Sequence, residues 1–138
     1  MSEHEEFAAA AAALCGVAFR LHGRDSATGL DCVGLVVVAL DRCGRKADAP
    51  EGYALRALSI APLLGFAARN GFAALDPHAL GEAGDLYLLR LSAIQAHLAI
   101  ILDRGRFVHA HAGLGKVVIG HGALPGEMIA RWRLMAKG

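Results

Sequence analysis

Net charge is almost absent from this chain. Its 14 lysines and arginines face 13 aspartates and glutamates, which leaves a formal net charge of +1. No block of basic residues breaks this balance along the sequence. Because nucleic-acid-binding domains concentrate positive charge on one surface, we exclude nucleic acid as the main partner.

Cysteine is scarce, and its spacing excludes two common uses. The three cysteines, Cys15, Cys32 and Cys43, are odd in number, so they cannot all pair within one chain. None of them belongs to a C-x-x-C motif of the kind that binds zinc. We therefore expect reduced thiols in a bacterial cytoplasm, with no metal and no cofactor.

The sequence also lacks the marks of export and of membrane insertion. The apolar stretch 7–19 follows an acidic N-terminus, whereas a signal peptide begins with basic residues. No segment reaches the roughly 18 apolar residues that a membrane span needs. These absences predict synthesis in the cytoplasm without a signal peptide, and no membrane span.

Apolar residues are plentiful, at 55% of the chain, which is enough for the core of a single domain over residues 1–138. The first half predicts helices at 5–21, 31–42 and 59–70. The second half predicts short strands at 85–91, 97–102, 106–110, 116–119 and 129–134. Helices followed by strands indicate an α+β fold, in which N-terminal helices pack on a C-terminal antiparallel sheet of about five strands.

The second helix is the most informative of these elements. Asp31 can cap its start and Gly44 can end it, although its β-branched valines leave a buried strand as an alternative. Cys32 would then lie in the first helical turn. Backbone N–H groups there favour negative charge, so we expect an ionised, nucleophilic thiol.

Two histidines that are distant in sequence supply a candidate base. A three-residue loop, Asp103-Arg104-Gly105, with Gly105 in the left-handed region, would join strands 97–102 and 106–110. That register pairs Ala99 with His109, and it places His97, His109 and His111 on one face of the sheet. Cys32 would act as nucleophile, His97 as general base and acid, and His109 as the group that orients His97. His111 has the same parity and remains an alternative to His109.

Six segments, in order along the chain, resemble a known family: FRLHGRD (19–25), GLDCVGL (29–35), AGDL (83–86), HLAI (97–100), FVHA (107–110) and ARWR (130–133). The family is the NlpC-type peptidoglycan endopeptidases, which are papain-like cysteine peptidases. The likeness is closest to the branch encoded with phage and gene-transfer-agent tail genes. It implies the fold predicted above and the catalytic positions Cys32, His97 and His109.

The resemblance also implies a substrate and three residues that bind it. Members typically cut the bond between D-glutamate and a diamino acid in the peptidoglycan stem peptide. Asp31, Phe19 and Val33 occupy positions that contribute to substrate binding in relatives. Many relatives have tyrosine where this chain has Phe19 and serine where it has Val33, so two hydroxyl groups are missing here.

The resemblance leads to two functional hypotheses. The first is a cell-wall cysteine endopeptidase that acts through an acyl-enzyme, carried to the wall in a phage-like particle and in contact with phage-like tail proteins. The alternative is a structural or wall-binding tail component that keeps the fold with weak or no catalysis. The two missing hydroxyl groups motivate this alternative.

Overall fold

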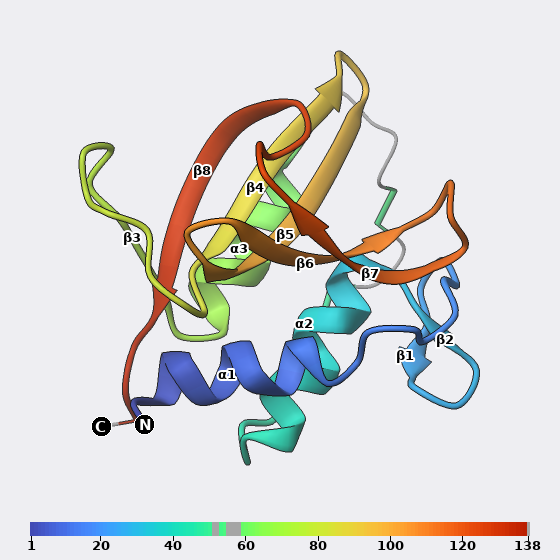
Figure 1. Cartoon of the computed structure of the whole chain (residues 1–138), viewed down its shortest axis with the longest axis horizontal. Coiled ribbons are helices and arrows are strands. Elements are labelled where there is room, and N and C mark those ends of the chain that lie inside the picture. The colour runs from blue at the N-terminus through green and yellow to red at the C-terminus, as the bar shows by residue number, and fades with distance from the viewer. Residues whose placement is uncertain (51–52, 55–58, 138) are drawn as a thin grey trace.

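Helices precede a β-sheet in the computed structural model, which describes residues 1–50, 53–54 and 59–137 (Figure 1). The helices are α1 (Glu3–Ala12), α2 (Cys32–Arg42) and α3 (Ala61–Arg69). A short ribbon, β1 (Arg24–Asp25) with β2 (Gly29–Leu30), precedes α2. The remaining strands are β3 (Phe72–Ala74), β4 (Leu86–Ser92), β5 (Gln95–Asp103), β6 (Arg106–His111), β7 (Lys116–His121) and β8 (Glu127–Leu134). This order confirms the predicted α+β class.

The main sheet has six antiparallel strands in the described residues, in the order β3-β8-β4-β5-β6-β7. Five of them correspond to the predicted strands. The sixth, β3, pairs with the end of β8 and was not predicted. Its three residues are too few to show the alternation by which a strand is recognised.

The first helix is shorter than the predicted range 5–21. It begins with a capping box between Ser2 and Glu5 and ends at Ala12. The chain then turns at Gly16, which has φ +94°. Residues 17–19 extend along β7 instead, where the N–H of Val117 donates to the carbonyl of Val17. The prediction was wrong here because the apolar stretch 7–19 serves first as a helix and then as sheet edge.

The second helix has the predicted bounds, Cys32–Arg42. Asp31 accepts a hydrogen bond from the N–H of Gly34 at 2.8 Å, and Gly44 follows the helix with φ +76°. The strand alternative is therefore wrong: tertiary burial of Val33 and Val36 outweighs the strand preference of valine. Among the described residues, no helix has both the length and the apolarity needed to cross a bilayer.

The two faces of the sheet bury different clusters. Even-numbered side chains such as Leu86, Leu98 and Val108 pack with residues of all three helices in the main core. Odd-numbered side chains form a smaller cluster on the opposite face: Tyr87, Leu89, Ala99, Ile101 and Phe107. Because side chains alternate along a strand, His97 and His109 belong to this second face.

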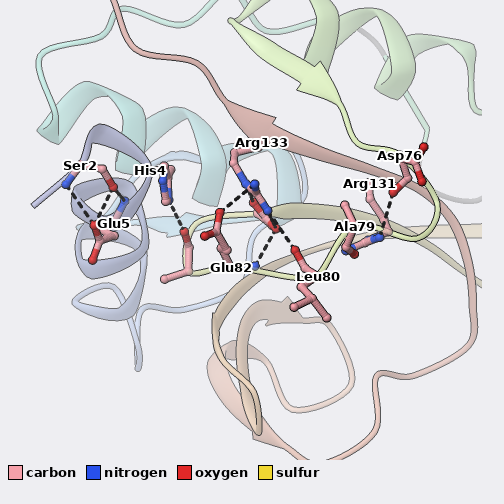
Figure 2. Close-up of polar contacts among 11 residues, drawn as sticks. Ser2, His4, Glu5, Asp76, Ala79, Leu80, Glu82, Arg131 and Arg133 are labelled. Atoms are coloured by element: carbon pink, nitrogen blue, oxygen red, sulfur yellow. Dashed lines mark hydrogen bonds and ion pairs between the residues drawn. The ribbon is translucent and has the colours of Figure 1, made fainter.

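A buried ion pair fixes the loop that enters β4. Asp85 is fully buried, and Arg133 of β8 donates to both of its carboxylate oxygens at 2.8 and 2.9 Å. Figure 2 shows that Arg133 also reaches Glu82 and the carbonyl of Leu80 in the same loop. The neighbouring Arg131 holds the carbonyl of Ala79 at 2.8 Å. These contacts tie loop 76–85 to β8.

Candidate active site

Cys32 is the first residue of α2, as predicted, and its thiol packs against β5. The backbone N–H groups of Leu98, of Val33 and of Cys32 itself lie close enough to the sulfur to lower the pKa of the thiol somewhat. The side chain is only 1% exposed. Burial first, and the carboxylate of Asp31 second, raise the pKa of the Cys32 thiol to about 12. The expectation of an ionised thiol was therefore wrong: desolvation outweighs the helix N-terminus, and the thiol is neutral.

The β5–β6 hairpin reaches the predicted register by a different turn. Ile101 pairs with Phe107 and Ile100 with Val108, which is the predicted alignment. At the tip, however, Asp103 pairs with Arg106, and Gly105 does not adopt the left-handed conformation. A two-residue turn alone would have shifted the strands by one residue. The irregularity between Ile101 and Asp103 supplies the extra residue and restores the register.

The register brings the two candidate histidines together. Nε2 of His97 lies 2.7 Å from Nδ1 of His109, and the rings meet edge to face at 4.9 Å. When Nε2 of His97 carries the proton and donates it to His109, Nδ1 of His97 remains as the acceptor that a general base requires. His111 does not take this position: its Nδ1 accepts from the N–H of Leu114, and its ring meets His109 edge to face at 5.5 Å. The geometry therefore favours His109 over His111 as the residue in contact with His97.

Burial keeps both imidazoles neutral. It lowers the pKa of His97 to about 3, with further contributions from His109 and His111. It lowers the pKa of His109 to about 4, with a further contribution from His111. A neutral imidazole can accept a proton, so His97 is in the state that a general base requires.

A small cavity of about 140 Å³ opens beside this pair. Its lining comes from β5, β6, the β6–β7 turn and three other segments: Phe19, Leu91, Gln95, Ala96, His97, His109, Ala110, His111, Ala112, Gly113 and Pro125. Cys32 is not part of this lining. The sulfur contacts β5 at Leu98, which is adjacent to His97 in sequence, yet no hydrogen bond joins the thiol to either imidazole in the described structure.

A larger hollow, of about 600 Å³, lies elsewhere on the protein. Tyr87, Arg104 and Arg133 are among its lining residues, and those described include neither cysteine nor histidine. The smaller cavity is therefore the candidate active-site cleft, because it contains the two residues able to move a proton.

A buried network surrounds the carboxylate of Asp31 beside the nucleophile. Besides capping α2, Asp31 accepts from Nη1 of Arg24 at 3.1 Å and from the backbone N–H of His22 at 2.8 Å. The hydroxyl of Tyr53 donates to it as well. Tyr53 in turn accepts from Arg24 at 2.9 Å, and its carbonyl contacts the His22 ring. Sequence analysis missed Tyr53 because it is 21 residues from Cys32 and belongs to no motif.

The three residues expected to bind substrate occupy different environments. Phe19 lines the cavity, as expected for a residue in contact with substrate. Asp31 and Val33 are fully buried and absent from the lining. Both oxygens of Asp31 are occupied by the donors just described. In this structure both side chains support α2 from within, and their contribution to substrate binding stays a prediction.

Comparison with known proteins gives matches at the level of structure. No family model matches the chain, and no curated protein matches it. NlpC1 from Trichomonas vaginalis has a TM-score of 0.68 at 17% identity, over 96% of this chain and 44% of that one. A Staphylococcus aureus protein described as similar to lipoprotein, NLP/P60 family, has a TM-score of 0.65 at 18% identity, over 98% and 42%. The peptidoglycan hydrolase RipB from Mycobacterium tuberculosis has a TM-score of 0.64 at 23% identity, over 98% and 66%.

These neighbours confirm the predicted fold. Structures described as NlpC or NLP/P60 proteins share it over 86–98% of this chain. The chain spans less than half the length of the first two, so it corresponds to one part of those proteins. The sequence resemblance to the phage-tail branch stays a prediction.

Proposed function

We propose that this protein is a cysteine peptidase that hydrolyses amide bonds in peptidoglycan stem peptides. The single observation that carries the proposal is the 2.7 Å contact between His97 and His109 in the candidate cleft. Cys32 begins α2, and the backbone N–H of Leu98, the residue after His97, lies close to its sulfur. The fold shared with NlpC/P60 proteins, among them structures described as peptidoglycan hydrolases, supports the choice of substrate.

The reaction begins from a neutral pair. Nδ1 of His97 takes the proton of the Cys32 thiol while the sulfur attacks the scissile carbonyl carbon. The backbone N–H of Cys32 stabilises the oxyanion that forms. His97 then gives its proton to the leaving amine, and the C–N bond breaks to leave a thioester on Cys32. Water, deprotonated by His97, attacks this thioester and releases the carboxylic acid and the free thiol.

The raised pKa of the thiol determines when, relative to attack on the substrate, the proton moves to His97. Transfer from a thiol of pKa about 12 to an imidazole of pKa about 3 is strongly unfavourable in the empty cleft. Proton transfer must therefore accompany attack on a bound substrate.

Cleavage between D-glutamate and a diamino acid, and carriage from the cytoplasm in a phage-like particle, are the finer parts of this proposal. Both derive from the sequence resemblance to the tail-associated branch. The segment 130–133 is the last of the six segments that resemble it. Phage-like tail proteins would be the protein partners. Co-purification of the chain with tail particles, compared with free protein in the same lysate, tests this part.

The second candidate is a wall-binding tail component without useful catalysis. The almost complete burial of the Cys32 sulfur favours it, together with the missing hydroxyl groups at Phe19 and Val33. In this case the cleft would hold a stem peptide without cutting it.

Digestion of purified wall sacculi separates the two candidates. Wild-type protein, Cys32→Ala and the matched control Cys15→Ala, at an exposed cysteine, are incubated with sacculi. New amine ends and the masses of released fragments are measured. Release by wild type and by Cys15→Ala, but not by Cys32→Ala, supports the peptidase. Binding without release by all three supports the wall-binding component, and equal release by all three contradicts the role of Cys32.

A further inference from the structure

Four positively charged side chains line a hollow of about 250 Å³ at the C-terminal end of α2. They come from three parts of the chain: Arg45 and Lys46 after α2, Arg69 at the end of α3, and Lys137 near the C-terminus. The hollow is separate from the candidate cleft, because Cys32 begins α2 and the 11 residues of this helix rise by about 15 Å. The fold thus gathers a cluster of cations far from the nucleophile.

Arg45 is fixed in this hollow by its surroundings. Its side chain is only 14% exposed, and its Nη1 donates to the carbonyl of Met135 at 2.6 Å. The guanidinium lies against Gly71, so that any Cβ at this position would push it away. Gly71 also has φ +83°, a conformation that other residues rarely adopt. The absence of a side chain at Gly71 therefore makes the room that the guanidinium occupies.

Lys137 is positioned by both of its nitrogen atoms. Nζ donates to the carbonyl of Gly44 at 2.8 Å, and the backbone N–H donates to the carboxylate of Glu3 at 2.6 Å. The second contact joins the two ends of the chain, which lie side by side (Figure 1). Because a carbonyl group carries no net charge, the bonds of Arg45 and Lys137 to carbonyls hold both cations in place without cancelling their charge.

Two carboxylates lie near these cations in the described residues, but neither forms a close ion pair with a cationic side chain of the hollow. Glu3 lies 3.8 Å from Arg45, and Asp48 lies 3.6 Å from Arg69. Both distances exceed the separation of about 2.7–2.9 Å in a charge-assisted hydrogen bond. The side chain of Asp48 is also 74% exposed, so water screens its charge. Four cations near two weakly paired carboxylates attract a further anion.

We infer that this hollow binds a phosphate group. Its volume of about 250 Å³ has room for roughly eight water molecules at about 30 Å³ each, which is enough for a phosphate with its ester oxygens. A phosphate presents its oxygens to several donors at once, and both arginine and lysine are common phosphate-binding residues. A carboxylate presents only two oxygens, so it would leave part of this cluster unused.

The source of the phosphate is a phosphodiester-linked polymer of the cell wall. This assignment rests on the proposed function, whereas the phosphate site itself does not. A wall polymer bound at one end of α2 would keep the peptidase on the wall while Cys32, at the other end, reacts. The formal net charge of only +1 argues against nucleic acid as the phosphate-bearing polymer.

Titration of the full chain, followed by its backbone amide signals in NMR spectra, tests the site without requiring catalysis. The probes are inorganic phosphate, poly(glycerol phosphate) and a single-stranded oligonucleotide with the same number of phosphates, all at one ionic strength set with chloride. Saturable shifts should appear at the amides of Gly44, Gly71 and Lys137. The polymer should bind at least about tenfold more tightly than inorganic phosphate, because its neighbouring phosphates rebind. No saturable shift with any probe, or shifts confined to other residues, overturns the inference.

Two double variants remove charge from the hollow. Arg45→Gln with Lys137→Gln removes the two cations that carbonyls hold in place, and Lys46→Gln with Arg69→Gln removes two exposed cations. Each pair should weaken the binding of inorganic phosphate at least about tenfold, because two charge-assisted bonds are lost. The second pair changes only exposed side chains, so it keeps the test valid where the first pair disturbs folding.

A third double variant is the matched control. Arg104→Gln with Lys116→Gln removes one arginine and one lysine at exposed positions outside the hollow. Phosphate should bind to it within about twofold of wild type, because charges beyond about 10 Å are screened by salt. Equal weakening by the control and by the hollow variants overturns the inference, since binding would then follow the net charge alone.

The probes also test the source of the phosphate. An oligonucleotide that binds more tightly than poly(glycerol phosphate), or a polymer that binds no more tightly than inorganic phosphate, overturns the assignment to a wall polymer. Phosphate binding should be unchanged in Cys32→Ala, which lacks the nucleophile. Failure of the phosphate titration while wild-type protein still releases wall peptides contradicts this inference alone and leaves the proposed function intact.

Discussion

Two buried aspartates, Asp31 and Asp85, keep their negative charges away from water in the same way at different places in the fold. Each is 0% exposed, each pairs with one arginine, and each accepts from a backbone N–H nearby. Asp85 anchors a loop to β8, and its environment contains no nucleophile among its described contacts. Asp31 caps the helix that begins with Cys32 and raises the pKa of that thiol. The two carboxylates are bonded alike, and both bonding patterns stabilise the fold. Only Asp31 affects a reactive group, because only Asp31 lies next to a cysteine thiol.

The largest expected difference between the two regions is in the effect of removing a histidine on the rate of wall-peptide release. His97→Ala should reduce release of wall peptides at least about 1,000-fold, because the thiol loses its only positioned base. His78→Ala, at an exposed residue of the loop anchored by Asp85, should leave the rate unchanged. Initial rates of amine release from sacculi measure both. A His97→Ala rate within threefold of wild type would contradict the role of His97.

Removal of either carboxylate should destabilise the fold by a similar amount. Asp31→Ala and Asp85→Ala each remove the buried carboxylate that an arginine and backbone N–H donors share, which we expect to cost about 3–5 kcal/mol of unfolding free energy. Urea denaturation followed by circular dichroism measures the loss. A cost below about 1 kcal/mol for one of them would show that its network is dispensable.

Acid should lower the free energy of unfolding through the buried histidine His97. The pKa of His97 is about 3 in the folded chain, below its ordinary value of about 6.5, so the unfolded chain binds this proton first as pH falls. The contribution is therefore complete above pH 6.5 and is lost progressively between pH 6.5 and pH 3. His97→Gln should flatten this part of the curve of stability against pH. A wild-type curve that is already flat there would contradict a buried neutral His97.

Charge removal without loss of shape should separate the two aspartates. Asp31→Asn keeps an acceptor but removes the negative charge beside Cys32, so the pKa of the thiol should fall. Asp85→Asn should leave it unchanged. The rate of iodoacetamide alkylation of Cys32 against pH measures the difference. The same profile in both variants would show that Asp31 does not act on the sulfur.

The smallest expected effect is at the tyrosines. Tyr53→Phe removes a hydroxyl that bonds both Asp31 and Arg24, and it should cost about 1–2 kcal/mol of unfolding free energy. Tyr87→Phe is the matched control beside the Asp85 region, where the ring lies under Arg131 and no hydrogen bond of its hydroxyl is described. It should cost less than about 0.5 kcal/mol. Thermal unfolding of the two variants compares them.

The features that could be predicted from the sequence are local ones. Asp31 and Gly44 mark the ends of α2 through capping rules that act within a few residues. The β5–β6 pairing followed from side-chain alternation, although the turn itself was wrong and an irregularity restored the register. The order of the patterns along the chain gave the α+β class, because helix-type and strand-type patterns occupy separate halves of it.

The features that could not be predicted depend on contacts between distant residues. Residues 17–19 join the sheet because β7 offers an edge, which no local pattern reveals. Tyr53 reaches Asp31 from a separate loop. The neutral state of Cys32 follows from burial by β5, while the sequence shows only the helix start that favours the opposite state. The sequence does not show how deeply each side chain is buried, because burial depends on these distant contacts.

Isolation of the acyl-enzyme tests the central claim most directly. Wild-type protein is mixed with soluble muropeptides and quenched in acid, and its cysteine-containing peptides are analysed by mass spectrometry. The account predicts a stem-peptide acyl group on Cys32, none on Cys15 or Cys43, and no adduct in His97→Ala. Release of new amine ends while Cys32 never carries an acyl group, or an adduct confined to another cysteine, would contradict it.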